Sequence, residues 1–459
     1  MSVSLPPENG FDLEVEVVIV GAGACGMVAA LAAADAGATV LVVEADAVPS
    51  GSTALSAGLI PAAGTRFQTE AGIDDRPDLF AKDIQSKAGG ENPQSLVDAL
   101  ANQASPAIEW LADRFDMPFS VVTDFDYPGH SRRRMHGLPT RSGQELVDRL
   151  RSTCETQGID IICNRRATRL FAKNGKMEGI EVEGPDGAET IGCQALVLAC
   201  NGFGGNRDMV AEHMPEIHDA LWFGHSGNCG DAVRWGDALG AETMHLGAYQ
   251  GHGNVATPHG ILITWAVITE GGVQVNLHGD RFWDESQGYS EAARAVLAQP
   301  EGFAWTIFDT RIADVARQFQ DFKDAEAAGA IRKADTLEEL AFTCSLDAAR
   351  LTATLDAVPH QSVDSFGRTF TGAPLSAPFC AVKVTGALFH TQGGLKVTPD
   401  ARVCLKGGGE VPNLFAAGGA AVGVSGSGDS GYLSGNGLLS AVVLGRIAGQ
   451  SAARDVLTG

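Results

Sequence analysis

The chain has 459 residues, of which 44% are hydrophobic and 19% charged, a composition typical of a soluble globular protein with two domains or one large domain carrying an insertion. Its net charge of −23 disfavours binding to nucleic acid and to anionic membrane surfaces. The nine cysteines have no CxxC pair and no metal-like spacing, so we expect reduced thiols, no metal site and a cytoplasmic location. The polar N-terminus is not typical of a signal peptide, and no apolar run approaches the roughly 20 residues that a membrane helix needs.

The first predicted elements are a strand, a glycine-rich turn, a helix and a second strand within residues 15–44. The apolar run 15–20 predicts a buried strand, and an alanine-rich helix to about residue 36 precedes a second strand over 39–43. The glycines of the turn are Gly21, Gly23 and Gly26. They allow a tight turn, close approach of a pyrophosphate and packing of the helix on the strand, while the amides at Ala24 face the phosphates and Glu44 can bind ribose hydroxyls. The pattern predicts a dinucleotide site.

Two later segments favour FAD as that dinucleotide. Residues 50–58 read SGSTALSAG, and small residues in succession let the backbone lie against a flat ring and a second phosphate run. Residues 411–419, VPNLFAAGG, predict another short strand ending in glycines, followed by a helix from Leu438 to about Ala453. A C-terminal segment that returns to the nucleotide site is what a long cofactor such as FAD needs.

Six segments, taken in order, resemble the fumarate reductase/succinate dehydrogenase flavoprotein superfamily. They are VGAGACGMVAALAAADAGATVLVVE, LVLACNGFGGN, GDRFWDES, FHTQGGLKV, VPNLFAAGG and SGNGLLSAVVLGRIAG. The resemblance implies an α/β fold, with a Rossmann-type FAD-binding domain over 1–246 and 391–459 and an inserted α+β cap domain over 247–390. Residues 311–358 fit such a cap, because they read as two polar amphipathic helical stretches separated by Gly329.

The resemblance also implies which residues contact FAD. They are Gly21, Gly23, Ala24, Gly26, Glu44, Ala45, Ser52, Thr53, Ser56, Ala57, Gly58, Ala167, Asn201, Gly202, Asp231, Gly418, Gly419, Asn436, Leu438 and Leu439. Membrane-bound members attach FAD through a histidine of the second glycine segment. Residues 50–58 contain no histidine, so we expect non-covalent FAD. No second nucleotide fingerprint follows LVLA, which disfavours a separate NAD(P)H site.

The catalytic positions differ from those of the fumarate reductases, which hold a dicarboxylate with two histidines and two arginines. His252 and His390 match the histidines, whereas Tyr289 and Tyr432 fall at the arginine positions. Arginine is always charged, but a tyrosine hydroxyl makes a neutral hydrogen bond. The exchange therefore favours a neutral carbonyl over a dicarboxylate.

The proton relay of the fumarate reductases is also missing. Its glutamate and arginine positions fall on Trp265 and Ile268, which cannot carry protons. The fumarate-reducing mechanism is therefore not expected to carry over.

The flavin 3-ketosteroid dehydrogenases of this superfamily show the same exchange of residues. The resemblance implies α,β-dehydrogenation of a ketone, either 3-oxosteroid-like or a smaller cyclic ketone. Tyr432 would polarise the carbonyl, Tyr289 would act as general base, and a hydride would pass to flavin N5. A backbone amide of Gly435 or Asn436 would assist Tyr432.

Further roles follow for the neighbouring residues. A tyrosine that acts as a base needs a nearby cation, and His252 and His390 are the candidates, although both can also be structural. Trp265, Ser434 and Gly435 are expected to line the substrate site, although core packing explains Trp265 equally well.

Two alternatives stay open. The first is an ene-reductase of an unsaturated carboxylate or enone that uses the two histidines and an arginine such as Arg141. The second is a flavin electron-transfer subunit without catalysis. Either enzyme would need a small-molecule substrate and an external electron acceptor, which could be oxygen, a quinone or a carrier protein. His136 and Cys25 are expected to be structural.

Overall fold

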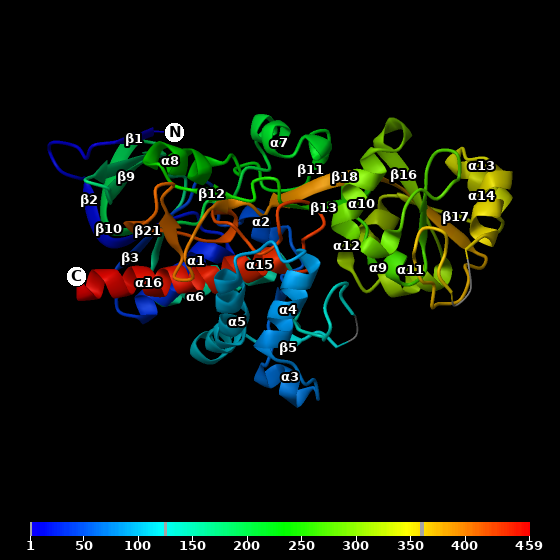
Figure 1. Ribbon diagram of the computed structural model, residues 1–459, viewed down its shortest axis with the longest axis horizontal. Coiled ribbons are helices and arrows are strands. Elements are labelled where there is room, and N and C mark those ends of the chain that lie inside the picture. Colours follow the sequence, from blue (N-terminus) through cyan, green and yellow to red (C-terminus); the bar gives the residue numbers. More distant parts are fainter. Residues whose placement is uncertain (1, 124–125, 359–361) are drawn as a thin grey trace. The chain divides into compact units, whose positions relative to one another are not determined.

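The computed structural model describes residues 2–123, 126–358 and 362–459, and it divides into two compact units (Figure 1). Unit 1 comprises Met1–Met214, Gly224–Tyr249 and His390–Gly459, and unit 2 comprises Pro215–Phe223 and Gln250–Phe389. The assignment of an FAD-binding domain to 1–246 and 391–459 and of a cap to 247–390 stays a prediction. None of the helices in the described stretches combines the length and apolar character that crossing a bilayer requires.

A mixed sheet, nine-stranded in the described residues, forms the centre of unit 1. Its strands are β1 (Ser2–Ser4), β2 (Leu13–Val20), β3 (Val40–Val43), β7 (Asp160–Ile162), β8 (Arg166–Lys173), β9 (Lys176–Gly184), β10 (Gly187–Leu198), β20 (Arg402–Cys404) and β21 (Glu410–Ala416). β2 runs parallel to β3 and β10, and β10 runs parallel to β21. The carboxyl ends of these four strands therefore share one edge, where Rossmann-type sheets bind their ligands.

Smaller elements surround this sheet. The helices are α1 (Ala24–Asp35), α2 (Gly51–Ala54), α3 (Arg66–Glu70), α4 (Pro77–Lys87), α5 (Gln94–Phe115), α6 (Gly143–Thr156), α7 (Arg207–His213), α8 (Asp231–Leu239), η4 (Gly418–Ala420), α15 (Asn436–Leu439) and α16 (Gly445–Thr458). Short strands are β4 (Ile60–Pro61), β5 (Ser120–Val121), β6 (Met135–Gly137), β12 (Thr243–Met244) and β19 (Gly394–Leu395). The helix predicted from Leu438 begins at Asn436 and passes through a π-helical turn, η5 (Ser440–Leu444), before α16.

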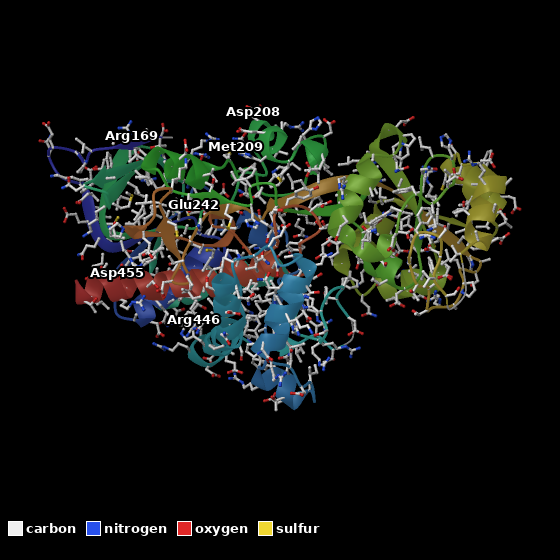
Figure 2. The ribbon with its side chains drawn as sticks, in the orientation of Figure 1. Arg169, Asp208, Met209, Glu242, Arg446 and Asp455 are labelled. Atoms are coloured by element: carbon white, nitrogen blue, oxygen red, sulfur yellow. The ribbon has the colours of Figure 1, made fainter. Side chains whose placement is uncertain are left out.

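Helix α16 packs directly on α1 (Figure 1). A methyl group at Gly449 would lie 2.1 Å from the carbonyl oxygen of Ala29, so the backbones approach more closely than any side chain would allow. Two α16 residues that Figure 2 labels tie the helix to the rest of unit 1: the Arg446 guanidinium lies 5.1 Å from the centre of the Trp110 ring, and Asp455 pairs with Arg402 at 2.5 Å.

Unit 2 is built on a second sheet, seven-stranded in the described residues, with β18 at its centre. Its strands are β11 (Leu221–Trp222), β13 (Tyr249–Ala256), β14 (Ile261–Leu262), β15 (Val273–Val275), β16 (Phe303–Asp309), β17 (Ile331–Ala334) and β18 (Phe379–Thr391), of which Tyr249 and the last two residues of β18 belong to unit 1. Its helices are η1 (Pro215–Ile217), α9 (Ala266–Thr269), η2 (Glu285–Gln287), α10 (Tyr289–Leu297), η3 (Pro300–Gly302), α11 (Thr310–Ala316), α12 (Gln320–Ala327), α13 (Leu337–Cys344) and α14 (Ala348–Asp356).

The prediction of two helical stretches over 311–358 is wrong. Four short helices, α11 to α14, occupy this region, with strand β17 between the second and third. Gly329 has φ +73° after α12, and Ser345 ends α13 in the left-handed conformation. Asp347 then caps α14 by accepting a hydrogen bond from the amide of Arg350. These helix ends and caps divide a segment whose hydrophobic periodicity, taken alone, predicts longer helices.

We predict that Gly26→Ala destabilises the protein by about 1–3 kcal/mol, the range for overpacking. The added methyl group would lie 1.8 Å from the carbonyl oxygen of Gly21 and would separate α1 from the end of β2. Gly407→Ala is the matched control, because no atom lies within 4 Å of the position of its methyl group. Urea unfolding measures both variants, and equal midpoints for the two would contradict the close packing at Gly26.

Candidate active site

The turn after β2 brings the predicted nucleotide residues together. Gly21 has φ +104°, and a methyl group there would lie 2.6 Å from a backbone carbonyl oxygen. The amide of Ala24, at the start of α1, donates to Thr53 Oγ1 at 3.1 Å. The Glu44 carboxylate accepts from the amide of Ala22 at 2.7 Å. The structure therefore holds the predicted ribose-binding carboxylate directly against the glycine turn.

The second glycine segment is fixed by its own hydrogen bonds. Ser56 Oγ donates to the carbonyl of Thr53 at 2.7 Å and accepts from the amide of Gly58 at 3.1 Å. Ser52 Oγ accepts from Asn228 Nδ2 at 2.8 Å. The serine side chains thus fix the backbone of this segment. The segment lies beside α1 because Thr53 Oγ1 accepts from the amide of Ala24.

A third group of predicted residues lies at the ends of β10 and β21. Asn201 has φ +63°, and its Oδ1 accepts from the amide of Gly202 at 2.8 Å. A methyl group at Gly419 would lie 2.1 Å from the same oxygen, so the two loops touch. Asp231, the first residue of α8, pairs with Arg166 at 2.8 Å; burial raises the pKa of Asp231, and Arg166 opposes that rise.

These loops fit a flavin dinucleotide. Asp231 Oδ1, Asn436 Oδ1 and Ser440 Oγ are buried and have no hydrogen-bond partner among the described residues. Two acceptor oxygens and a hydroxyl suit a ligand that carries both hydroxyl or N–H donors and oxygen acceptors, as FAD does. The other predicted contacts in unit 1 are Gly23, Ala45, Ala57, Ala167, Gly418, Leu438 and Leu439.

Tyr432 lies in the loop before α15 and is 7% exposed. Burial raises the pKa of its phenol above the ordinary value, while the backbone amides of Gly437 and Gly435 donate toward the oxygen and oppose that rise. The phenol is therefore neutral at physiological pH. The ring of His390 packs edge-on against it at 5.6 Å.

The structure corrects one prediction about this loop. A backbone amide of Gly435 or Asn436 was expected to assist Tyr432, but the amide of Asn436 donates to the carbonyl of Leu433 at 3.0 Å. The Asn436 amide therefore serves the loop itself, and the assistance of Gly435 stays a prediction. The carbonyl of Ser434, predicted to lie in the substrate site, accepts from His130 Nε2 at 2.9 Å.

A buried hydrogen-bond chain sets the protonation of His390. Asn436 Nδ2 donates to the carbonyl of Val424 and to Ser425 Oγ, each at 3.0 Å. Ser425 Oγ then donates to Gln392 Oε1 at 2.7 Å, and Gln392 Nε2 donates to His390 Nδ1 at 2.8 Å. His390 Nδ1 also lies 3.4 Å from the carbonyl oxygen of Thr391, a group that can only accept. The contact with Gln392 Nε2 is shorter, so we assign Nδ1 as the acceptor and the His390 proton to Nε2. Burial lowers the pKa of His390 to about 4, so it is a neutral donor.

His252 of unit 2 has the same protonation. Its Nδ1 accepts from the amide of Asn254 at 3.1 Å, which leaves the proton on Nε2. Its ring stacks on Tyr289 at 5.0 Å and on Phe389 at 5.3 Å, with Trp265 edge-on at 5.7 Å. Burial lowers the pKa of His252 to about 3.

The neutral state of both histidines contradicts the expectation that His252 or His390 supplies a cation for a tyrosine base. Apolar burial determines the outcome, because no carboxylate contributes to the pKa of either imidazole.

Tyr289 is the first residue of α10 and follows Gly288, which has φ +134°. A helix N-terminus favours negative charge, which suits a residue proposed to take up a proton. Trp265 and Ile268, at the positions of the missing proton relay, are both buried in the apolar core of unit 2.

Two other residues from the sequence lie apart from this chemistry. Arg141, the arginine of the ene-reductase alternative, is exposed. His136 is buried and bonds to Thr65 Oγ1 at 2.7 Å and to the carbonyl of Arg134 at 2.9 Å. These bonds agree with the structural role expected for His136.

Sequence reasoning missed Gln392, Ser425 and His130. Gln392 follows His390 by two positions, and alternation along extended backbone places such side chains on one face, so the sequence carries a usable signal. Ser425 meets Gln392 across 33 positions and His130 meets Ser434 across 304. No local pattern predicts contacts of that separation.

We predict that Gln392→Glu converts His390 to an imidazolium. A carboxylate accepts instead of donating, so it draws the proton to Nδ1, and its charge raises the pKa of His390 from about 4 toward neutral pH. Nitrogen NMR of histidine-labelled protein at neutral pH measures the change. Gln392→Met is the control, because it removes the donor without adding charge and leaves the ring neutral. A neutral His390 in Gln392→Glu would contradict the relay.

A family model and a curated relative match most of this chain. The family model described as "FAD binding domain" matches residues 16–438. A curated relative, the probable fumarate reductase Ifc3 of Shewanella frigidimarina, is 33% identical over 96% of this chain and 75% of its own length.

Two solved structures resemble the fold. An open flavocytochrome c3 fumarate reductase has a TM-score of 0.83 and 31% identity, covering 98% of this chain and 80% of that chain. A 3-ketosteroid-delta4-(5alpha)-dehydrogenase from Rhodococcus jostii has a TM-score of 0.76, covering 98% and 99%; at 24% identity it shows the fold alone. This chain belongs to the FAD-binding flavoprotein family that includes the fumarate reductases, and it is an FAD-dependent oxidoreductase that acts on CH–CH groups.

Proposed function

We propose that this enzyme moves two hydrogens across the Cα–Cβ bond of a ketone, in the manner of a ketone dehydrogenase. The observation that carries the proposal is Tyr432, a buried phenol that packs edge-on against His390 at 5.6 Å and whose pKa burial raises, so that it is neutral. Such a phenol is a strong donor for a carbonyl oxygen. Stabilising the negative charge that develops there is where a single donor has its largest effect, about 3–4 kcal/mol.

The charge of the surrounding groups supports a neutral substrate. In unit 1, Tyr432 lies beside His390, and both are neutral; in unit 2, His252 is neutral as well. Each of the three can donate a hydrogen bond to an oxygen. A buried dicarboxylate would receive no cation from Tyr432, His390 or His252, and a buried charge without a cation is strongly unfavourable.

Tyr432 and Tyr289 have separate roles in the proposed dehydrogenation. When bound, FAD would supply the two-electron acceptor for the β-hydrogen of the substrate. Tyr432 donates to the carbonyl oxygen, which makes the α-proton more acidic. Tyr289, in its phenolate form, takes up that proton and becomes the neutral phenol; this role rests on the family resemblance and on the N-terminus of α10, where negative charge is favoured. An external acceptor, which is oxygen, a quinone or a carrier protein, removes the two electrons.

The cofactor is proposed to be bound without a covalent link, because residues 50–58 contain no histidine. The residues proposed to hold it are the glycine turn after β2, Glu44, Thr53, Asp231 and Asn436, which all lie in unit 1.

Reduction of an α,β-unsaturated carboxylate or enone is the second candidate. The names of the curated relatives favour it, since they include a probable fumarate reductase and a urocanate reductase. This candidate needs a cation for the carboxylate, and the neutral state of His252 and His390 disfavours such an anion.

The direction of the reaction and the charge of the substrate can be measured together. We predict that cyclic ketones, added without oxygen, bleach the visible absorbance of the flavin, and that fumarate does not reoxidise the reduced enzyme. If an unsaturated carboxylate oxidises reduced viologen and no ketone changes the flavin absorbance, the enzyme is a reductase and the proposed ketone dehydrogenase is refuted. No spectral response to either class would indicate an electron-transfer subunit.

We predict that Tyr432→Phe lowers kcat on a responsive ketone by roughly 10²–10³, the effect of removing one donor to a developing oxyanion. Tyr289→Phe should abolish proton uptake and lower kcat at least as far. Tyr127→Phe is the control, since Tyr127 has no role in the proposed chemistry. Steady-state kinetics on the three variants provides the test, and wild-type turnover in both Tyr432→Phe and Tyr289→Phe would refute the mechanism.

A further inference from the structure

The amide that sets the proton of His252 belongs to a peptide group that is bound at both ends. The N–H of this group, from Asn254, donates to His252 Nδ1 at 3.1 Å. Its carbonyl, from Gly253, accepts from Gln274 Nε2 at 2.8 Å. Since the carbonyl and the N–H of one peptide group are conjugated, a donor at the carbonyl strengthens the N–H as a donor on the other side. Gln274 therefore acts on His252 through a single peptide group.

The neighbours of Gln274 fix the orientation of its side-chain amide. Trp283 Nε1 can only donate, and it donates to Gln274 Oε1 at 3.0 Å. The carbonyl of Gly253 can only accept, so the nitrogen of the amide must face it. Both side chains, of Gln274 and of Trp283, are buried. The amide cannot turn over without losing both hydrogen bonds.

Gln274 is anchored at its backbone as well. Its N–H donates to Glu285 Oε1 at 3.0 Å. Glu285 is completely buried, and it pairs with Arg281 at 2.5 Å and with Arg368 at 3.1 Å. A carboxylate that two guanidinium groups bind has little freedom to move. The ion cluster thus fixes the point on β15 from which the Gln274 side chain reaches Gly253.

Thr306 holds the other side of the arrangement. It lies opposite Gln274 in the register of β15 and β16, and its Oγ1 accepts from Gln274 Nε2 at 3.4 Å. The same hydroxyl donates to Asn254 Oδ1 at 2.6 Å. Asn254 Nδ2 donates to the carbonyl of Ile263 at 3.2 Å, which leaves Oδ1 as the end that meets Thr306. Gln274, Thr306 and Asn254 are all completely buried.

The other neighbours of His252 do not distinguish its two ring nitrogens. Tyr289 and Phe389 stack on the imidazole and Trp265 meets it edge-on. Such ring contacts are nearly the same when the imidazole turns by 180°. Among the residues that the structure describes, the Asn254 amide is the only hydrogen-bond partner of the imidazole. This amide therefore decides which nitrogen carries the proton and on which side that nitrogen lies.

We propose that Gln274 and Thr306 are positioning residues that hold His252 as a donor, with its Nε2–H available to an oxygen of the substrate. Gln274 strengthens the amide that occupies Nδ1, and Thr306 keeps that amide in place. A histidine held in this way can meet a carbonyl or hydroxyl oxygen, but it cannot take up a proton at Nε2. The inference rests on the proposed function only in taking His252 as a group that meets the substrate.

The arrangement can be tested without substrate. Histidine labelled with nitrogen-15 is incorporated into the FAD-loaded full chain, and nitrogen NMR at neutral pH records both ring nitrogens of His252. His252→Gln identifies these signals by their loss. In Gln274→Met the donor to the Gly253 carbonyl is removed, and we expect the Nδ1 signal to shift toward that of a nitrogen that accepts no hydrogen bond. Thr306→Val should shift the signal in the same direction.

Two further variants serve as controls. Thr306→Ser keeps the hydroxyl, so the His252 signals should stay at their parent positions. Thr385→Val removes another hydroxyl of the same sheet, one that donates to the carbonyl of Gly302 at 2.8 Å, and it should leave the His252 signals unchanged. Urea unfolding of each variant checks that it folds. If Gln274→Met does not fold, Thr306→Val carries the test against these two controls.

The outcomes separate this inference from the proposed function. Unchanged His252 signals in Gln274→Met and Thr306→Val overturn the inference, and so does an equal shift in Thr306→Ser or Thr385→Val. A shift confined to the first two variants supports it. If no ketone is turned over, the proposed function is refuted, and such a shift still stands as a property of unit 2.

Turnover gives a second measurement once a responsive ketone is known. Gln274→Met and Thr306→Val should lower kcat/KM by about fivefold, the effect of weakening one hydrogen bond, while Thr306→Ser should keep the parent value. Parent kcat/KM in both of the first two variants would overturn the positioning role.

Discussion

The close packing of α1 on two sides is the constraint on which unit 1 depends. Its first turn lies against the glycine turn after β2, and its outer face lies against α16, where a methyl group at Gly449 would meet the backbone of Ala29. Only glycine permits these distances. They bring the C-terminal segment, more than four hundred positions away in the chain, to the glycine turn after β2, so that the loop of Tyr432 and the start of α15 belong to the same unit as that turn.

The polar groups assigned to catalysis are uncharged, and each is uncharged for an identifiable reason. Burial keeps Tyr432, His252 and His390 neutral, and a neighbouring donor at Nδ1 leaves the proton of each imidazole on Nε2. Arg134, a buried cation of unit 1, is matched by two carboxylates. Each of the three groups offers a hydrogen-bond donor without a positive charge, which supports the proposal of a carbonyl over a carboxylate as substrate.

Much of unit 1 could be predicted because its signals are local. The apolar run, the three glycines and Glu44 correctly indicate β2, α1 and β3 within two residues, and the ordered family motifs correctly indicate FAD. The four helices over 310–356 were not predicted, because helix caps interrupt a hydrophobic pattern that otherwise looks continuous. The partners of His390 and of the loop that carries Tyr432 were not predicted for another reason: His130 meets Ser434 and Ser425 meets Gln392 only through tertiary packing.

The π-helical turn at Ser440–Leu444 has a consequence for the evolution of the chain. A π turn holds one residue more than an α turn, and each residue of a helix advances its face by about 100°. Loss of a single residue from this turn would restore a regular helix and rotate α16 by that angle relative to α15. Gly445 and Gly449 would then face away from α1, and larger side chains would meet its backbone. The number of residues in this stretch is therefore as constrained as their identity, because a deletion here would break the contact of α16 with α1.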